Sequence, residues 1–201
     1  METIAYCPLP IPCHNYSTFS ANPKYKRKTP NTEHRTHIIE VIMNLDQQFQ
    51  NLINEAPNYG VPAPIMEHGV IPVLKVYAQQ LRHQQYYLRQ TLDNNLVLSI
   101  LSNQAQPEVE KKVVYAFPSV ADAIEFADSD IERLDIVAQE VSISQILFQM
   151  FTLKEVDSVI FLDTPQDYRQ SKEIYCNKLQ QAIQQNLKML LDAKKNSSNI
   201  V

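Results

Sequence analysis

The chain has 201 residues, of which 44% are hydrophobic and 20% are charged, and this composition is typical of one globular domain with a single core. Its 18 basic and 22 acidic side chains give a net charge of −4, which argues against nucleic acid as the main partner. No apolar run reaches the length of about 18 residues that a membrane-spanning helix requires, and the first 30 residues contain no secretory signal, so we expect a cytoplasmic protein.

Residues 1–42 differ in composition from the rest of the chain. They contain five prolines and a basic cluster at residues 24–28, and they lack apolar periodicity over most of their length. We expect a disordered basic tail here, or an upstream extension that is not translated if Met43 is the initiator. Residues 43–195 are then expected to form a single α/β domain, and residues 196–201 to fray.

Two helices are predicted at the start of this domain. Asn44 and Gln47 have the spacing of a capping box, and apolar residues follow them at helical intervals. After a break at residues 57–64, which contains proline and glycine, a second apolar stripe runs over residues 65–81. Pro72 lies inside this second helix and is expected to kink or split it, because proline removes one backbone donor and clashes with the preceding turn.

An antiparallel strand meander is predicted next. Residues 86–92 and 96–101 flank the turn Asp93-Asn94-Asn95 and form a predicted hairpin. The alternative is that the first of these segments prolongs the preceding helix. A third strand is expected over residues 112–117, after a polar loop.

Three strand–helix units complete the predicted domain. Apolar strands at residues 113–117, 136–141 and 159–162 each lead to a Ser or Thr that can cap a helix. The cap pairs are Ser119 with Asp122, Ser142 with Gln145, and Thr164 with Asp167, and Pro165 suits the first position of the last helix. That helix is the longest, with an expected buried stripe from Tyr168 to Leu190. We therefore predict an α+β fold in which two N-terminal helices, the meander and these three units share one mixed sheet.

The chain lacks the motifs of several enzyme classes. Its only glycines are Gly60 and Gly69, so it contains no Gly-rich phosphate loop of the Rossmann or P-loop type and no GxSxG nucleophile motif. None of the five histidines lies within residues 84–194, which excludes a Ser-His or Cys-His relay built inside that segment. A relay that reaches back to His68 or His83 stays open. We predict no catalytic residue and no cofactor.

Metal-ligand residue types occur near the start of the chain, but their spacing is irregular. They follow the pattern C-x5-CH and then H-x2-H, which matches no structural zinc site, and they are Cys7, Cys13, His14, His34 and His37. We therefore predict no metal site. The third cysteine, Cys176, is expected to be a small buried hydrophobe, and an odd number of cysteines implies no disulfide framework.

An acidic stretch is the main candidate for a contact surface. Residues 122–140 contain seven acidic side chains, and Arg133 is the one basic residue among them. A calcium loop is not expected, because Arg133 occupies the position at which an EF-hand requires glycine. The stretch is either a solvated helix face and loop or a surface for a basic protein partner. The predicted contact residues are Asp122, Glu125, Asp128, Asp130, Glu132 and Asp135.

The order of elements over residues 84–162 resembles that of SseB-like domains. The resemblance lies in the strand that ends Val-Val-Tyr-Ala-Phe-Pro-Ser-Val-Ala-Asp-Ala and in the later step Val-Ser-Ile-Ser-Gln-Ile-Leu. Tic22-like proteins of cyanobacteria and chloroplasts are similar over the same stretch, although they resemble a doubled unit and this chain shows one. The glutamine-rich composition also resembles that of filamentous cyanobacterial proteins. The resemblance implies a non-enzymatic interaction module and supplies no catalytic residue.

The leading interpretation is a non-catalytic protein-interaction or regulatory accessory domain, since the sequence patterns for nucleophilic, phosphate and metal chemistry are missing. Its contact surfaces would be the acidic stretch and the exposed edge of the strand meander. The first alternative is a small enzyme that uses carboxylate or tyrosine acid-base groups, which are recognised by geometry and not by sequence. The second alternative is weak nucleic-acid association through the basic N-terminal tail.

Overall fold

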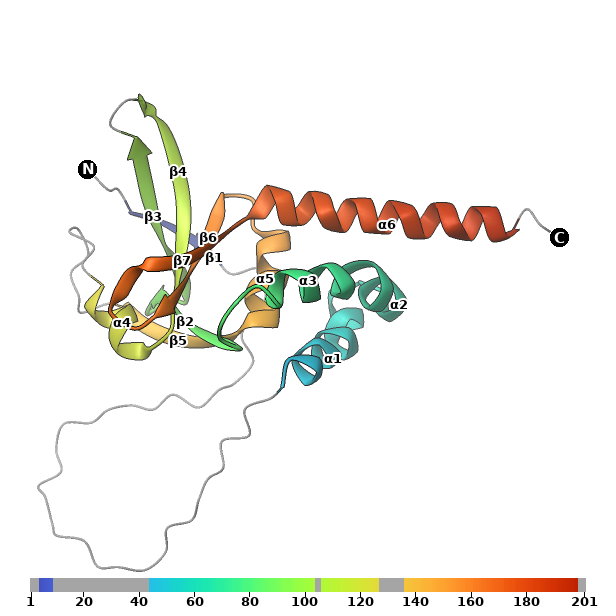
Figure 1. Ribbon diagram of the computed structural model, residues 1–201, viewed down its shortest axis with the longest axis horizontal. Coiled ribbons are helices and arrows are strands. Elements are labelled where there is room, and N and C mark those ends of the chain that lie inside the picture. The colour runs from blue at the N-terminus through green and yellow to red at the C-terminus, as the bar shows by residue number, and fades with distance from the viewer. Residues whose placement is uncertain (1–3, 9–43, 104–105, 127–135, 199–201) are drawn as a thin grey trace, which may run out of the picture.

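The computed structural model describes residues 4–8, 44–103, 106–126 and 136–198 (Figure 1). These residues form a mixed sheet of seven strands with helices packed against it, which confirms the predicted α+β class. The strands are β1 (Ile4–Pro8), β2 (Gln85–Thr91), β3 (Asn95–Asn103), β4 (Gln106–Phe117), β5 (Ile136–Ser142), β6 (Ser158–Thr164) and β7 (Asp167–Tyr175). The helices are α1 (Leu45–Glu55), α2 (Ala63–Ile65), α3 (Ile71–Ala78), α4 (Val120–Glu125), α5 (Ile143–Thr152) and α6 (Cys176–Ser198), with a 3₁₀ turn η1 (Ala56–Tyr59) and a π turn η2 (Met66–Val70).

β1 comes from a part of the chain for which disorder was predicted. Its residues pair antiparallel with β3, from Ile4 opposite Ser99 to Pro8 opposite Asn95. The expectation of a disordered tail over residues 1–42 therefore needs correction for this strand. The physical reason is that β1 supplies backbone partners to an edge of β3 that would otherwise be unpaired. The rest of that tail, like the basic cluster within it, lies outside the described residues.

α1 begins as predicted. The Gln47 N–H donates to Asn44 Oδ1 at 2.9 Å, and the Asn44 N–H donates to Gln47 Oε1 at 3.3 Å, so both bonds of the capping box are present. The helix buries Phe49 and Leu52 in the core. It runs into η1, which ends at Gly60 with a φ of 74°, a conformation that glycine adopts without strain.

The second predicted helix is interrupted just before Pro72: α2, the π turn η2 and α3 follow one another, and Pro72 is the second residue of α3. Pro72 has no N–H for the carbonyl of His68, to which position 72 would donate in a regular α-helix. Asn186 of α6 provides a donor instead, because its Nδ2 lies 3.0 Å from the carbonyl oxygen of His68 and 2.8 Å from that of Gly69. Gly69 also permits a close approach of the two helices, since an added Cβ would lie 2.2 Å from Leu187 Cδ2.

The sheet is built around a meander in which β2, β3 and β4 each pair antiparallel with the other two. The predicted β2–β3 hairpin is confirmed, with Asn94 at a φ of 62° in its turn. β5 pairs antiparallel with the whole of β2, from Gln85 opposite Ser142 to Thr91 opposite Ile136. β6 runs parallel to β4, and β7 runs antiparallel to β6 and ends the strand order on that side.

Two of the three predicted strand–helix units are confirmed. The Ser119 side chain caps α4 by accepting from the Asp122 N–H at 3.1 Å. The Ser142 side chain caps α5 by accepting from the Gln145 N–H at 3.4 Å. Both caps satisfy backbone donors that a helix start leaves unpaired.

The third predicted unit is wrong. No helix begins at Thr164; the chain turns there and returns as β7, and α6 begins only at Cys176. Gln166 adopts a φ of 61° in this turn, and its N–H donates at 2.9 Å to Asp122, a carboxylate on α4. The strand also gives β6 a partner on the side that β4 does not occupy. Residues 168–175 are therefore strand and not the first part of a helical stripe.

The two faces of the sheet are covered unequally. One face, called here the helix-covered face, packs against α1, α3, α5 and α6, and its large apolar core includes Leu88, Val114 and Phe161. The other, called here the α4 face, has a smaller apolar cluster that includes Phe117 and Leu162. Side chains of β4 and β6 alternate between these two cores, as the pleat of a strand requires.

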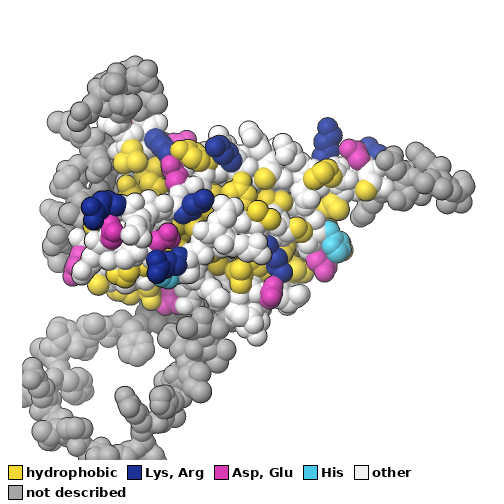
Figure 2. All heavy atoms as spheres, in the orientation of Figure 1, with side chains coloured by type: hydrophobic (Ala, Val, Ile, Leu, Met, Phe, Trp, Pro, Cys, Tyr) yellow, Lys and Arg dark blue, Asp and Glu magenta, His cyan; other side chains and the backbone are white. Residues whose placement is uncertain are grey.

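α6 is the longest helix and extends beyond the other helices as an arm (Figure 1). Leu179 and Ile183 are buried near its start, as predicted. Hydrophobic side chains are exposed on its outer half (Figure 2), where Met189 is 63% and Leu191 is 56% exposed. These two residues point about 200° apart around the helix axis, so they form no common apolar face. None of the helices in the described ranges combines the length and the apolar content needed to cross a membrane.

Candidate binding surface

β7 is an edge strand with one unpaired side. Its inner side pairs with β6, from Ser158 opposite Tyr175 to Leu162 opposite Ser171. No strand in the described ranges pairs with its outer side. Residues 168–172 along it are all exposed. An exposed edge of this kind offers backbone N–H and C=O groups to a strand of another chain.

The turn that leads into β7 places a cation at the start of this edge. Asp167 Oδ1 accepts from the Arg169 backbone N–H at 3.1 Å and from the Arg169 Nε at 3.3 Å. The backbone bond contributes most, and together the two bonds hold the pKa of the Asp167 carboxyl below its usual value. The β6–β7 register shifts between Leu162 and Thr164, which marks a bulge beside the turn. The Arg169 side chain is 93% exposed and is therefore available to a partner.

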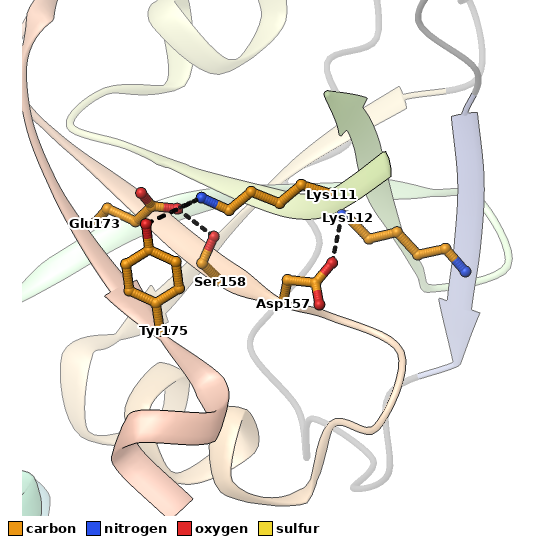
Figure 3. A network of polar contacts seen from close by, with 6 residues as sticks. All are labelled: Lys111, Lys112, Asp157, Ser158, Glu173 and Tyr175. Carbon is orange, nitrogen blue, oxygen red and sulfur yellow. Dashed lines mark hydrogen bonds and ion pairs between the residues drawn. The ribbon is translucent and has the colours of Figure 1, made fainter. Parts of the chain in front are cut away.

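A polar network on the α4 face ties β7 to β4 across β6 (Figure 3). Lys111 of β4 forms an ion pair with Glu173 of β7, and the Ser158 hydroxyl of β6 donates to the same carboxylate at 2.5 Å. The Lys111 ammonium also lies 4.5 Å from the ring centre of Tyr175, and the ammonium of Lys178 lies 5.0 Å from that centre. The network thus joins three strands and the first turn of α6.

The charges in this network are stabilised and are not tuned for proton transfer. Burial alone would raise the pKa of Glu173, but hydrogen bonds from Lys111 and Ser158 outweigh burial and lower it. Burial alone would lower the pKa of Lys111, but its bonds to Glu173 and Tyr175 raise it. Both groups stay charged near neutral pH, whereas a general acid or base needs a pKa close to the working pH. The network therefore fits a structural brace for β7.

Aromatic side chains connect α4 with the start of β7. The ring centre of Phe126 lies 4.8 Å from that of Tyr115 and 5.3 Å from that of Tyr168. Tyr168 is 45% exposed, so its ring is supported on one side and open on the other. Val120 and Ile124 of α4 are further large apolar side chains with exposed surface. Aromatic rings held in this way are frequent anchors in protein interfaces.

The structure divides the six predicted contact residues. Asp122 is 3% exposed, and its carboxylate accepts from the Ser119 hydroxyl at 2.5 Å and from the Gln166 N–H at 2.9 Å. It therefore fixes the β6–β7 turn to α4 and does not belong to an exposed surface, because both bonds draw it into the fold. Glu125 is exposed on α4. The other four predicted contact residues, Asp128, Asp130, Glu132 and Asp135, lie outside the described residues.

A depression of about 290 Å³ lies between the loop that joins α5 to β6 and the start of α6, with Cys176 in its lining. Two of its polar side chains already have partners: Gln180 Nε2 donates to the carbonyl of Phe151 at 3.2 Å, and Asp157 Oδ2 accepts from the Lys112 N–H at 2.7 Å (Figure 3). Cys176 is buried, as predicted, and burial raises the pKa of its thiol to about 12. The thiolate that a nucleophile requires is therefore not formed at neutral pH.

The two histidines of the described ranges differ in their contacts. His83 Nε2 lies 2.8 Å from the carbonyl oxygen of Asp163, and the His83 backbone N–H donates to the Tyr86 hydroxyl at 3.3 Å. Burial raises the pKa of Tyr86 to about 12, so its phenol stays protonated at neutral pH. His68 is exposed on η2 with Glu67 at 3.9 Å. Within the described ranges, no group of three His, Cys, Asp or Glu side chains is placed to hold a metal ion.

The β7 edge was not found from the sequence, because residues 167–175 were assigned to the last helix. One signal was available. Five polar residues separate Tyr168 from Ile174, which leaves an apolar helical stripe broken for more than one turn. A short strand between two turns accounts for that gap better than a helix does.

Comparison with known proteins adds no assignment to this geometry. No family model, no curated protein and no solved structure matches the chain. The resemblance to SseB-like and Tic22-like domains stays a prediction.

Proposed function

We propose that this chain is a non-catalytic protein-binding module whose β7 edge accepts an extended segment of a partner protein as an added strand. The observation that carries the proposal is the unpaired outer side of β7, with residues 168–172 exposed along it. Strand addition requires no deep pocket, because backbone hydrogen bonds give affinity and the flanking side chains give selectivity.

Side chains beside the edge support a selective contact. Tyr168 is supported by Phe126 and partly exposed, and Arg169 extends into solvent. Tyrosine and arginine are enriched among the residues that dominate interface energies. Val120 and Ile124 add exposed apolar surface on α4, the helix whose Asp122 side chain holds the turn into β7.

The brace between Lys111 and Glu173 supports the same function. It fixes β7 to the sheet through β6, so the edge is ordered before a partner arrives. A preorganised edge loses less conformational entropy on binding than a mobile one does. The brace is therefore a positioning device for the binding strand.

The ionisable groups favour binding over the enzyme alternative. Asp167 and Glu173 both have lowered pKa values, and Tyr86 and Cys176 both have pKa values raised to about 12. Each of these groups keeps its ordinary charge state at neutral pH. Acid-base catalysis would require the opposite tuning, with a carboxyl pKa raised or a phenol pKa lowered toward neutrality.

The proposed partner is a protein. A basic partner was expected for the acidic stretch, and Glu125 is the predicted contact residue that is both described and exposed. The β7 edge instead presents Arg169 and Lys172 to solvent, which favours a segment that carries acidic side chains. Association with nucleic acid would depend on residues 24–28, which lie outside the described ranges.

Selection from a random peptide library, followed by amide NMR of the labelled chain, tests the proposal. A selected peptide is expected to shift the amide signals of residues 167–173. Tyr168→Asp is expected to weaken that peptide by about tenfold or more, because it removes the aromatic anchor and adds a charge beside the edge. Leu92→Asp is the matched control, since Leu92 is 67% exposed in the β2–β3 turn and the change adds the same carboxylate.

Two results would contradict the proposal. One is a set of shifted amides that lies away from β7 and α4. The other is a peptide that binds Tyr168→Asp and Leu92→Asp equally well. Circular dichroism of each variant checks that the chain is folded, so that weaker peptide binding can be attributed to a lost contact.

A further inference from the structure

We propose that β5 pairs antiparallel with β5 of a second copy of this chain, with the two Gln139 residues opposite each other on a two-fold axis. The same strand would serve on both copies, as a two-fold interface requires. β5 and β7 lie at opposite ends of the strand path β5-β2-β4-β6-β7. The contact therefore goes beyond the proposed function and leaves the β7 edge of each copy open.

β5 is an edge strand with regular pairing. All seven of its residues pair with β2, and the register contains no shift. No strand in the part of the chain that the structure describes pairs with its other side. Val141 packs into the core of the helix-covered face, whereas Ala138 packs against the cluster of the α4 face. The side chains of β5 therefore alternate between the two faces, as the pleat of a strand requires.

One hydrogen bond shows which backbone groups of β5 face outward. The Ile143 N–H donates to the carbonyl oxygen of Gln84 at 3.0 Å, and these two residues lie opposite each other when the β2–β5 register is continued. In an antiparallel pair, every second residue bonds to the partner strand and the residues between them face away. Odd-numbered residues of β5 therefore bond to β2. The outward-facing residues are Ile136, Ala138, Glu140 and Ser142.

A side chain occupies the place of a partner's donor at this edge. Gln139 Nε2 donates at 3.0 Å to the carbonyl oxygen of Glu140, which is one of the outward-facing groups. In the proposed pair, the N–H of the partner's Ala138 would replace this donor. The two released Gln139 side chains would then lie opposite each other, and each amide has both a donor and an acceptor for the other.

β5 lacks the features by which natural sheets prevent edge pairing. Those features are proline, bulges and charged side chains, above all lysine. β5 contains no proline and no register shift, and Glu140 is its one charged residue. β7 differs, because Arg169 and Lys172 lie along its edge and a register shift lies beside its first turn. β5 is therefore the edge that suits a second copy of the chain.

One two-fold register uses the whole of β5. A centre at Gln139 places residue 136 opposite residue 142 of the partner, so the full strand pairs and outward-facing residues meet one another. It places Glu140 opposite the partner's Ala138 and Val137 opposite the partner's Val141, so no like charges meet. A centre at Ala138 would pair residues 136–140 alone, and a centre at Glu140 would place two carboxylates opposite each other.

The expected dimer is weak and reversible. Val137 is 43% exposed, so the partner's Val141 can reach it and form an apolar cross-strand pair. One strand pair buries less than the about 1,200 Å² at which stable interfaces begin, so dimer formation should depend on protein concentration. A dimer would present two β7 edges, which would strengthen the binding of a partner that carries two acceptable segments.

Sedimentation equilibrium of the full chain, from micromolar to millimolar concentration, tests the proposal. The wild-type chain is expected to form dimer at the upper end of this range. Gln139→Lys and Gln139→Glu are each expected to raise the dimer dissociation constant by about fivefold or more, because each places like charges opposite each other on the axis. An equimolar mixture of the two variants should dimerise at least as well as the wild-type chain, because lysine then faces glutamate.

The control variants are Gln185→Lys and Gln185→Glu on α6. Gln185 is exposed, and these substitutions make the same changes in net charge. Both should dimerise as the wild-type chain does, alone and mixed. Recovery in the mixture of Gln139 variants also separates a lost contact from a misfolded chain, since mixing two misfolded variants would not restore a dimer.

Hydrogen exchange at low and high protein concentration locates the contact. The outward-facing amides of Ala138 and Glu140 are expected to exchange more slowly at high concentration. The amides of Gln139 and Val141 bond to β2 in the monomer, so their exchange should depend far less on concentration. This alternation along one strand is specific to a second strand added at the β5 edge.

Three results would overturn the proposal. The first is a wild-type chain that stays monomeric at millimolar concentration. The second is a mixture of Gln139→Lys and Gln139→Glu that dimerises no better than either variant alone. The third is a dimer whose concentration-dependent amides lie outside β5. Peptide binding at β7 is measured separately, so a monomeric chain whose β7 amides shift with a selected peptide would refute self-pairing and leave the proposed function in place.

Discussion

The two faces of the sheet are held together by different interactions. The helix-covered face depends on apolar burial, with side chains such as Leu147 and Phe161 at 0% exposure. The α4 face has a smaller apolar cluster, and beside β7 it adds partly exposed polar contacts such as Lys111 with Glu173, which contribute about 0–1 kcal/mol each. Stability is therefore concentrated on the helix-covered face. Substitutions near β7 should cost less stability, so these residues can be selected for binding.

Phe161→Ala should have the largest effect, because it removes a fully buried ring from the helix-covered face. The ring lies 5.1 Å from that of Tyr86, and its loss should lower the free energy of unfolding by about 3–5 kcal/mol. Ile160→Ala, one residue earlier and on the α4 face, is the matched comparison and should lower it by about 2 kcal/mol or less, since Ile160 is only partly buried. Urea unfolding measures both variants, and equal losses would contradict the contrast between the faces.

Gly69→Ala should have the next largest effect, at the contact between η2 and α6. The new Cβ would lie 2.2 Å from Leu187 Cδ2, and overpacking of this kind lowers the free energy of unfolding by about 1–3 kcal/mol. The higher helix propensity of alanine offsets about 1 kcal/mol of this loss. Thermal unfolding of Gly69→Ala, Leu187→Ala and the double variant measures the coupling. Strictly additive losses would show that the two positions are not in steric contact.

Glu173→Gln sharpens the contrast through its pH dependence. The folded-state pKa of Glu173 lies below its value in the unfolded chain, so between the two values the unfolded state binds more protons. Its stabilising contribution is present above the unfolded pKa of about 4.3 and is lost as the pH falls through the folded pKa. At neutral pH the variant should lose about 1 kcal/mol or less, because the pair is partly exposed.

Urea titrations of the wild-type chain and of Glu173→Gln between neutral and acid pH measure this contribution. The two stability curves should converge as the pH falls. A gap between them that stays constant to low pH would show that the loss arises from packing and not from the charge of Glu173.

Tyr168→Ala should have the smallest effect on stability. It removes one edge-on aromatic contact with Phe126 from a residue that is 45% exposed, so the free energy of unfolding should fall by about 0.5–1 kcal/mol. Binding of a selected peptide should fall far more, as measured by titration calorimetry. A variant that loses stability as Phe161→Ala does, yet binds normally, would reverse the proposed division between the faces.

Local signals in the sequence were sufficient for much of the fold. Ser119 and Ser142 each precede a helix that their side chains cap, and Asn44 with Gln47 forms the predicted capping box. These bonds join residues three positions apart, so a short window of sequence contains everything that determines them. The interruption just before Pro72 is local for the same reason.

The prediction of the third strand–helix unit was wrong because contacts with residues distant in the sequence determine its conformation. Thr164 and Pro165 have the local pattern of a helix start, but Gln166 takes a positive φ and bonds to Asp122 on a different element. The residues after the turn also pair with the side of β6 that β4 leaves unoccupied. This pairing depends on the whole sheet and cannot be seen in a short window of sequence. The candidate site was lost with it, because an edge strand was assigned to a helix.

The acidic contact surface shows a related limit. Composition draws attention to residues 122–140 but does not distinguish a carboxylate that faces solvent from one that bonds within the fold. Asp122 was predicted as a capping partner and as a contact residue, and the structure supports only the first role. The Asp122 carboxylate is buried and directs its two bonds to groups within the fold, so it does not face a partner.

The bond from Asn186 to the carbonyl that Pro72 leaves without an amide donor has an evolutionary consequence. A residue with an N–H at position 72 could donate to His68 within its own helix, and Asn186 would then be needed for the Gly69 carbonyl alone. With a proline at position 72, the Asn186 side chain supplies a donor to the His68 carbonyl. In homologous chains the two positions should therefore covary, although they are far apart in the sequence and neither belongs to the binding edge.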